Sequence, residues 1–400
     1  MRKIILFLGI WSAFAMGSKL KVPAEPPSKE CDKIVGCYYN CRSFDNESNK
    51  DLLIDQMDVS LCTHLFYDCV GLKENATLQI ENDYKNLEFE AYQQLIELRK
   101  KNIKLKTLVT ITGLYDENIQ DINNKALTDP NLRNKLVDNI ADFVKKYGFN
   151  GLDLEYSQSY PQTDEQLSDK ENFVLLLKAL RERFDKEDLI LSVVVDPIET
   201  TAKILYDIEG ISKYVNFINL KTFDFHGRFD LEKKFGLGYI TPMYPSLKDN
   251  ADERKINIDY VVKYWISQGA PPKKLILGIP FHGISFILLN PNQIDRDSPL
   301  TDDEKTGVQL QYNQICSYEK DPQQKHFYDK VQQVPYMYCS GNQIIAYDNV
   351  KSIKMKAEYA QKMQLGGAMA FTIDQDDFSG TCGEKFPLLN TLSQALKNQC

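Results

Sequence analysis

Two carboxylates and a hydroxyl follow one another at alternate positions in the stretch "YGFNGLDLEYSQSYP". They belong to Asp153, Glu155 and Ser157. Because side chains on a β-strand alternate between faces, all three lie on one face of the strand that this stretch predicts. A carboxyl group held there could serve as a general acid or base. Ser157 is not predicted to be a nucleophile, because no GxSxG motif or neighbouring histidine accompanies it.

Short β-branched and apolar runs alternate with helical patterns from about residue 33 onward. The helix before Asp153 has the clearest limits, because Asp129 and Pro130 begin it and Gly148 follows its end. Further helices are predicted at ENFVLLLKALRERF, NIDYVVKYWISQG, VKSIKMKAEYAQKMQL and PLLNTLSQALKNQ. The eight strand candidates are KIVGCYYN, LCTHLFYD, LKTLVTIT, GLDLEY, LILSVVVD, VNFINLKTF, KLILGIPF and GGAMAFTID.

This alternation favours an α/β fold built as a closed parallel (β/α)8 TIM barrel over a doubly wound sheet. Residues 288–345 break the pattern, because they are polar and rich in Asn, Gln, Asp and Tyr. We predict that they form a small subdomain inserted before the last strand. The barrel is then expected to comprise residues 31–287 and 346–400.

The N-terminus carries a targeting pattern. Residues 1–17 combine a basic start, an apolar run too short to span a bilayer, and small residues near Gly17. They predict a secretory signal peptide and hence a secreted, extracellular protein without a membrane anchor. Asn46 and Asn75 are then candidate glycan acceptors. Nine cysteines fit an oxidising compartment, and their odd number leaves one thiol free or paired with another molecule.

Composition and charge exclude several other classes. The chain is 43% hydrophobic and 26% charged, as in ordinary globular proteins, and its net charge is −8. Such a charge argues against a nucleic acid or an anionic membrane as partner. We expect no cofactor and no metal. The four histidines, His64, His226, His282 and His326, lack the spacing of metal ligands. The acidic cluster after the last strand, Asp374, Asp376 and Asp377, is interpreted as a structural element or a solvated loop before a calcium site.

Four separated motifs together resemble the family-18 glycoside hydrolases, which include chitinases and chitinase-like lectins. They are FNGLDLEY, FINLKTFDFHG, KLILGIPFHGISF and GGAMAFTIDQDDFSGTCGEKFPLLN. The resemblance covers nearly all of the chain after the signal peptide, and it implies that the inserted subdomain is an α+β domain beside the sugar groove. Active members carry D-G-x-D-x-D-x-E on one strand. Its Glu protonates the glycosidic oxygen, and the neighbouring Asp positions the substrate's own N-acetyl group for attack.

Aligned without a gap, the motif places a serine where the general acid belongs. Its carboxylates correspond to Asn150, Asp153, Glu155 and Ser157. A lone hydroxyl cannot supply the proton, and general acid catalysis contributes roughly 10²- to 10⁴-fold in rate. Glu155 would lie about 6 to 7 Å short of the acid's place. We therefore expect a degenerate motif without a catalytic residue.

A second motif also differs from that of the active relatives. Active relatives have M-T-Y-D where this chain has Lys221, Thr222, Phe223 and Asp224. Phe223 cannot supply the hydrogen bond of the tyrosine that steadies the N-acetyl group. Lys221 carries a charge toward the barrel centre, and we predict an ion pair with Glu155 or Asp153. A lysine that extends to the mouth of the barrel is the alternative.

The flat aromatic surfaces of a chitinase groove are mostly missing from this vestigial ligand groove. Trp11 lies in the signal peptide, and Trp265 lies on a predicted outer helix where packing explains it. The resemblance places Phe371, Leu114 and Arg42 where three groove tryptophans are usual, and His282 and Ile284 where a Tyr and an Arg are usual. Phe371 could still stack weakly on one sugar ring.

The resemblance also implies two disulfides, Cys37 with Cys62 and Cys316 with Cys382. It leaves the pairing of the other five cysteines open. Cys41 with Cys69 and Cys31 with Cys400 are possible bridges, and Cys339 is then the candidate for the odd thiol.

We interpret the chain as a secreted, catalytically inactive chitinase-like protein of the lectin, growth-factor-like or inhibitor-like type. It is expected to be a monomer that binds a protein, with millimolar or no affinity for chitooligosaccharides. The alternative is a weak or altered family-18 glycosidase that uses Glu155 as acid. A third possibility is a storage, salivary or venom component for which the barrel is only a stable secreted body.

Overall fold

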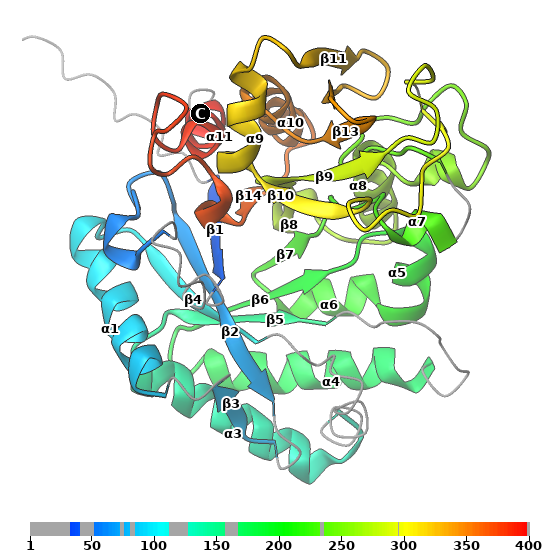
Figure 1. Cartoon of the computed structure of the whole chain (residues 1–400). Coiled ribbons are helices and arrows are strands. Elements are labelled where there is room, and N and C mark those ends of the chain that lie inside the picture. The colour runs from blue at the N-terminus through cyan, green and yellow to red at the C-terminus, as the bar shows by residue number, and fades with distance from the viewer. Residues whose placement is uncertain are drawn as a thin grey trace, which may run out of the picture.

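The computed structural model describes residues 33–40, 52–72, 76–80, 85–111, 127–156, 167–232, 236–294 and 296–397. It confirms a (β/α)8 barrel (Figure 1). The eight parallel strands are β1 (Ile34–Asn40), β2 (His64–Leu72), β4 (Lys106–Ile111), β5 (Gly151–Glu155), β6 (Ile190–Val195), β7 (Phe217–Leu220), β8 (Leu275–Pro280) and β14 (Gly367–Phe371). The first strand pairs with both β2 and β14, and this double pairing closes the barrel. A short strand, β3 (Leu78–Ile80), pairs antiparallel with the C-terminal end of β2.

Helices surround the barrel and include the four further helices predicted from the sequence. Those four correspond to α4 (Leu167–Phe184), α8 (Ile258–Ser267), α10 (Val350–Lys362) and α11 (Pro387–Lys397). The structure adds α1 (Lys85–Lys101) and the short helices α5 (Glu199–Leu205), α6 (Ile208–Tyr214) and α7 (Phe229–Glu232), which the sequence pattern does not single out. Within the described ranges, no helix is both long and apolar enough to cross a membrane.

The helix before the central strand, α3 (Pro130–Tyr147), begins and ends as predicted. Asp129 caps it by accepting a hydrogen bond from the backbone N–H of Asn131 at 2.7 Å. Gly148 ends it in the left-handed conformation with φ 77°, which glycine adopts without steric cost. Asn150 follows, and its Oδ1 accepts from the Thr107 backbone N–H at 2.9 Å. These contacts fix where β5 enters the barrel.

A second, antiparallel sheet forms the inserted domain. Its order is β10 (Val308–Gln311), β9 (His282–Ile287), β13 (Gln343–Ala346), β12 (Val334–Cys339) and β11 (Lys325–Asp329), and α9 (Tyr312–Lys320) accompanies it. This sheet begins at His282 rather than at residue 288, so the run PFHGISF is shared between the barrel and the insertion. The run is buried throughout and only Phe281 separates the two strands, so no polar loop marks the break after β8.

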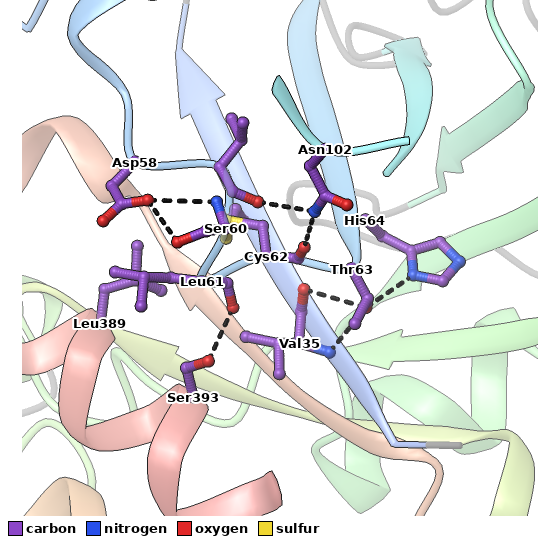
Figure 2. Close-up of a disulfide and its surroundings, with 12 residues drawn as sticks. Val35, Asp58, Ser60, Leu61, Cys62, Thr63, His64, Asn102, Leu389 and Ser393 are labelled. Carbon is purple, nitrogen blue, oxygen red and sulfur yellow. Dashed lines mark hydrogen bonds between the residues drawn. A yellow bond between two sulfur atoms is a disulfide. The ribbon is translucent and has the colours of Figure 1, made fainter. Parts of the chain in front are cut away.

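The described residues contain two disulfides, and they are the two that the resemblance implies. Cys37 of β1 is bonded to Cys62, just before β2. Figure 2 shows this region, where Ser393 of α11 donates to the Leu61 carbonyl at 2.8 Å. Cys316 of α9 is bonded to Cys382, between β14 and α11. The first strand, the insertion and the last helix are thereby tied to one another.

The remaining cysteine and N-terminal predictions are tested only in part. Cys339 is buried and has no disulfide partner among the residues that the structure describes. Cys31, Cys41 and Cys400 lie outside the described residues, as do the predicted signal peptide and both candidate glycan acceptors, Asn46 and Asn75.

His64, at the start of β2, makes folding sensitive to acid. It packs edge-on against Phe217 and lies 2.9 Å from Thr63 Oγ1. Desolvation, with a contribution from the charge of Lys106, lowers the pKa of His64 from 6.5 to about 4. The unfolded chain therefore binds a proton between these two values that the folded chain does not bind. This contribution to stability is complete above pH 6.5 and is lost as the pH falls toward 4.

We predict that His64→Gln reduces this pH dependence. Between about pH 7 and about pH 5 the unmodified chain should lose about 2 kcal/mol more of its free energy of unfolding than the variant loses. Urea denaturation at both pH values measures the difference. The exposed His326 provides the control, because His326→Gln should keep the full dependence; equal losses in His64→Gln and the unmodified chain would contradict the prediction.

Candidate functional site

Asp153 of β5 lies fully buried inside the barrel and collects hydrogen bonds from four other strands. Its carboxylate accepts from Tyr38 Oη of β1 at 2.6 Å and from Ser192 Oγ of β6 at 2.5 Å. Asn219 Nδ2 of β7 donates at 3.0 Å, and Thr110 Oγ1 of β4 lies at 3.4 Å. The carboxylate is thus the centre of a network across five strands.

The network offsets only part of the cost of burying this group. Burial raises the pKa of Asp153 from 3.8 to about 6, although the hydrogen bonds from Ser192, Tyr38 and Asn219 act in the opposite direction. Burial and the adjacent Asp153 carboxylate also raise the pKa of Tyr38 well above its usual value, so its hydroxyl remains a donor. The site can therefore hold or release one proton near pH 6.

Glu155 ends β5 and pairs with Lys221, which follows β7. Lys221 Nζ lies 3.0 Å from Glu155 Oε1, with side chains 31% and 17% exposed, respectively. Burial by itself would lower the pKa of Lys221, but the charge and hydrogen bond of Glu155 outweigh burial and raise it. The predicted ion pair is confirmed with Glu155 as the partner. The ammonium group also lies 5.7 Å from the centre of the Phe371 ring.

An aromatic group forms the floor beside this pair. The Phe371 ring lies 5.0 Å from Phe223 and 5.2 Å from Tyr38. Phe223 is buried and has no hydroxyl, so it offers no hydrogen bond to a ligand. Trp265 is fully buried in α8 and donates to the Pro197 carbonyl at 3.0 Å, as its predicted packing role requires. Phe371 is therefore the one predicted groove aromatic that the structure keeps at the floor without burying it completely.

The wall beside the floor joins the barrel to the insertion. His282 Nε2 of β9 lies 2.8 Å from Asp224 Oδ1, in the segment after β7. His282 is buried, whereas the side chain of Asp224 is 43% exposed. Ile284, two residues along β9, is also buried. The pair holds the inserted domain against the mouth of the barrel. Part of the Asp224 carboxylate remains exposed to solvent.

The structure separates the predicted site residues into three groups. Asp153, Glu155, Lys221, Phe223 and Phe371 come together, and the pair of Asp224 and His282 lies beside them. Asn150 lies at the opposite end of β5, where its Oδ1 accepts from the Thr107 backbone N–H and from Arg99 Nη1. Ser157, Leu114 and Arg42 lie outside the described residues.

Sequence reasoning missed the donors Tyr38, Ser192 and Asn219. The register of β5 against β6 could have identified Ser192, because Ser192 pairs with Asp153 in the sheet. A buried carboxylate needs donors from its neighbours at that level.

The acidic residues after β14 are structural. Asp376 and Asp377 are fully buried, so a solvated loop is the wrong interpretation for both. Asp376 accepts from the Leu389 backbone N–H at 2.9 Å, and Asp377 accepts from that of Cys382 at 2.7 Å. Over the described ranges, the group with metal-binding spacing is Cys316, Asp377 and Cys382, but its two sulfurs are bonded to each other.

Comparison with known proteins places this geometry in context. The model of glycosyl hydrolases family 18 matches residues 34–376. Human Chitinase-3-like protein 2 is 30% identical over 379 residues, which cover 90% of this chain and 92% of that protein. Probable chitinase 10 of Drosophila melanogaster is 29% identical over 380 residues, which cover 91% of this chain but only 16% of that protein.

Two solved structures, a chitinase and a pseudo-chitinase, share this fold. The Group IV chitinase of Ostrinia furnacalis superposes with a TM-score of 0.83 at 32% identity, over 91% of this chain and 99% of that one. Human YKL-39, described as a pseudo-chitinase that retains chitooligosaccharide binding, superposes with a TM-score of 0.80 at 29% identity, over 91% and 99% of the two chains.

We predict that Lys221→Met lowers the free energy of unfolding by about 1 to 2 kcal/mol, because it removes the ammonium group 3.0 Å from the partly buried Glu155 Oε1. The double variant Lys221→Met/Glu155→Gln should recover most of this loss, since both charges are then absent. Urea denaturation of the single and double variants measures the coupling.

The exposed pair Lys354–Glu358, 4.0 Å apart on α10, provides a matched control. Its Lys→Met variant should change stability by less than about 0.5 kcal/mol. Equal stability of Lys221→Met and the unmodified chain would show that the ion pair does not stabilise the fold.

Proposed function

Because the chain belongs to glycosyl hydrolase family 18, we propose that it is a secreted chitinase-like protein that binds its ligand without hydrolysing it. In this proposal Ser157 takes the place of the catalytic glutamate, and residues 1–17 are removed as a signal peptide. The predicted glycans at Asn46 and Asn75 belong to the same proposal. We also propose that the chain is a monomer.

The ion pair between Glu155 and Lys221 carries the proposal. A general acid must present a proton to the leaving oxygen, whereas Oε1 of Glu155 accepts a hydrogen bond from an ammonium group 3.0 Å away. Asp153 is likewise enclosed by donors from Tyr38, Ser192 and Asn219. Neither carboxylate of β5 is arranged to protonate a bound glycan. This argues against the alternative, an altered glycosidase that uses Glu155.

Binding is the function that this mouth supports. Phe371 offers one partly exposed ring, and Asp224 offers a partly exposed carboxylate beside it. One stacking surface stabilises one sugar ring, so we propose weak chitooligosaccharide binding, with a protein as the main partner. The similarity to YKL-39, a pseudo-chitinase with retained chitooligosaccharide binding, supports the glycan half of this proposal.

A fluorogenic chitobioside tests the absence of hydrolysis. We expect no turnover at about pH 5 or about pH 7, since neither Asp153 nor Glu155 is placed to supply the proton. An active family-18 chitinase in the same assay shows that the substrate is competent. Cleavage that disappears in Glu155→Gln would contradict the proposal and establish the enzyme alternative.

Titration with chitotetraose tests binding at the mouth. We expect a Kd near 1 mM, or about −4 kcal/mol, and a loss of about threefold or more in Phe371→Leu, which removes the stacking face. Tyr318→Leu, at an exposed aromatic residue of α9, is the matched control and should bind as the unmodified chain does. A flat titration at about 10 mM would contradict the glycan half of the proposal.

A further inference from the structure

A second cavity lies between the inserted domain and the last two helices, and it shares no residue with the barrel mouth. Its volume is about 430 Å³, within the range of small-molecule sites. The cavity is bounded by α9, β11 and the segments that begin α10 and α11. Figure 1 shows these elements at the same end of the molecule. The Cys316–Cys382 disulfide lies in its wall and links two of these segments.

Aromatic side chains make up much of the lining. Tyr312 and Tyr347 are buried, whereas Phe327 is 37% exposed. One face of Phe327 stacks on Tyr336 with ring centres 5.1 Å apart. Tyr328 already carries Lys351 Nζ over its ring at 3.9 Å. The cavity thus presents flat apolar surface of the kind on which a sugar ring packs.

The two inner carboxylates of the cavity are already engaged within the protein. Glu319 accepts from Tyr312 Oη at 3.0 Å and from Tyr347 Oη and Asn349 Nδ2, both at 2.9 Å. Asp377 accepts from backbone N–H groups, including that of Cys382 at 2.7 Å. Because a bound cation would compete with these hydrogen bonds, neither carboxylate favours a cationic ligand.

The polar groups left at the rim are mainly basic. Lys320, His326 and Lys351 are exposed and line the cavity, and within the described part of the chain none of them forms a salt bridge. Glu384 is the exposed acid beside them. Two helices also begin here, since Asn349 caps α10 and Pro387 is the first residue of α11. The positive ends of both helix dipoles add to the attraction for an anion.

We propose that this cavity binds a sugar of one or two rings that carries an oxyanion, either a sulfate, a phosphate or a carboxylate. The ring packs on the aromatic lining that includes Phe327, and the oxyanion faces Lys320 and Lys351. A neutral N-acetylglucosamine lacks the group that the basic rim recognises. The site is independent of the barrel mouth and of whether the chain hydrolyses or binds chitooligosaccharides.

Titration of the full chain with four small probes tests the site. The probes are N-acetylglucosamine 6-sulfate, glucose 6-phosphate, glucuronic acid and neutral N-acetylglucosamine, each followed by NMR or calorimetry. We expect at least one anionic sugar to bind about tenfold more tightly than the neutral sugar. The rank order of the three anions distinguishes sulfate, phosphate and carboxylate. Added salt should weaken the binding, because exposed charges are screened.

Variants locate the binding. Lys320→Gln/Lys351→Gln should lose about tenfold in affinity for the preferred anion. Lys354→Gln is the matched control, because Lys354 is an exposed lysine on α10 that does not line the cavity. Chitotetraose binding at the barrel mouth should be the same in all three proteins, which separates this test from that of the proposed function. All these lysines are exposed, and melting temperatures verify that the variants fold.

Three outcomes overturn the proposal. The first is the absence of binding for all three anionic sugars at about 10 mM, well above the expected Kd. The second is a neutral sugar that binds as tightly as the anions. The third is an equal loss of affinity in Lys354→Gln, which would show that general surface charge, and not this cavity, holds the anion.

Discussion

The structure depends on keeping a carboxylate buried at the centre of the barrel. Removing an ionised carboxylate from water costs several kcal/mol unless donors and nearby charges compensate for the lost solvent. Asp153 obtains its donors from β1, β4, β6 and β7, so strands distant in sequence are joined through one side chain. Its pKa, raised by burial to about 6, shows that this compensation is incomplete. The centre of the fold is thus a hydrogen-bonded network that compensates only partly for the burial of Asp153.

Glu155 meets the same constraint in a different way. It lies one layer nearer to solvent than Asp153, where an ammonium group can reach it, and Lys221 supplies that group at 3.0 Å. The charge that would otherwise repel Asp153 is balanced by a cation instead of by neutral donors. The same lysine covers part of the Phe371 ring. Lys221 therefore pairs with Glu155 and also occupies part of the aromatic surface of the site.

Local patterns made much of this fold predictable. Asp129 and Gly148 fix the limits of α3, the eight apolar runs form the eight strands, and an inward lysine near two inward carboxylates predicts the ion pair. The start of the insertion could not be predicted, because PFHGISF has no polar loop within it and only strand pairing divides it after Pro280. The donors around Asp153 depend on register across the sheet. The second cavity depends on segments such as α9 and α11, which only the tertiary fold brings together.

The inserted domain connects these features, because its position is fixed from two sides. His282 reaches Asp224 at the barrel mouth, and Cys316 is bonded to Cys382 beside the second cavity. A surface fixed in this way loses little conformational freedom when a ligand binds, so a modest number of contacts suffices for recognition. Catalysis makes a stricter demand, since a proton donor must reach one particular oxygen. A barrel in which β5 presents an ion pair to its mouth can fail that demand and still offer preorganised surfaces for binding.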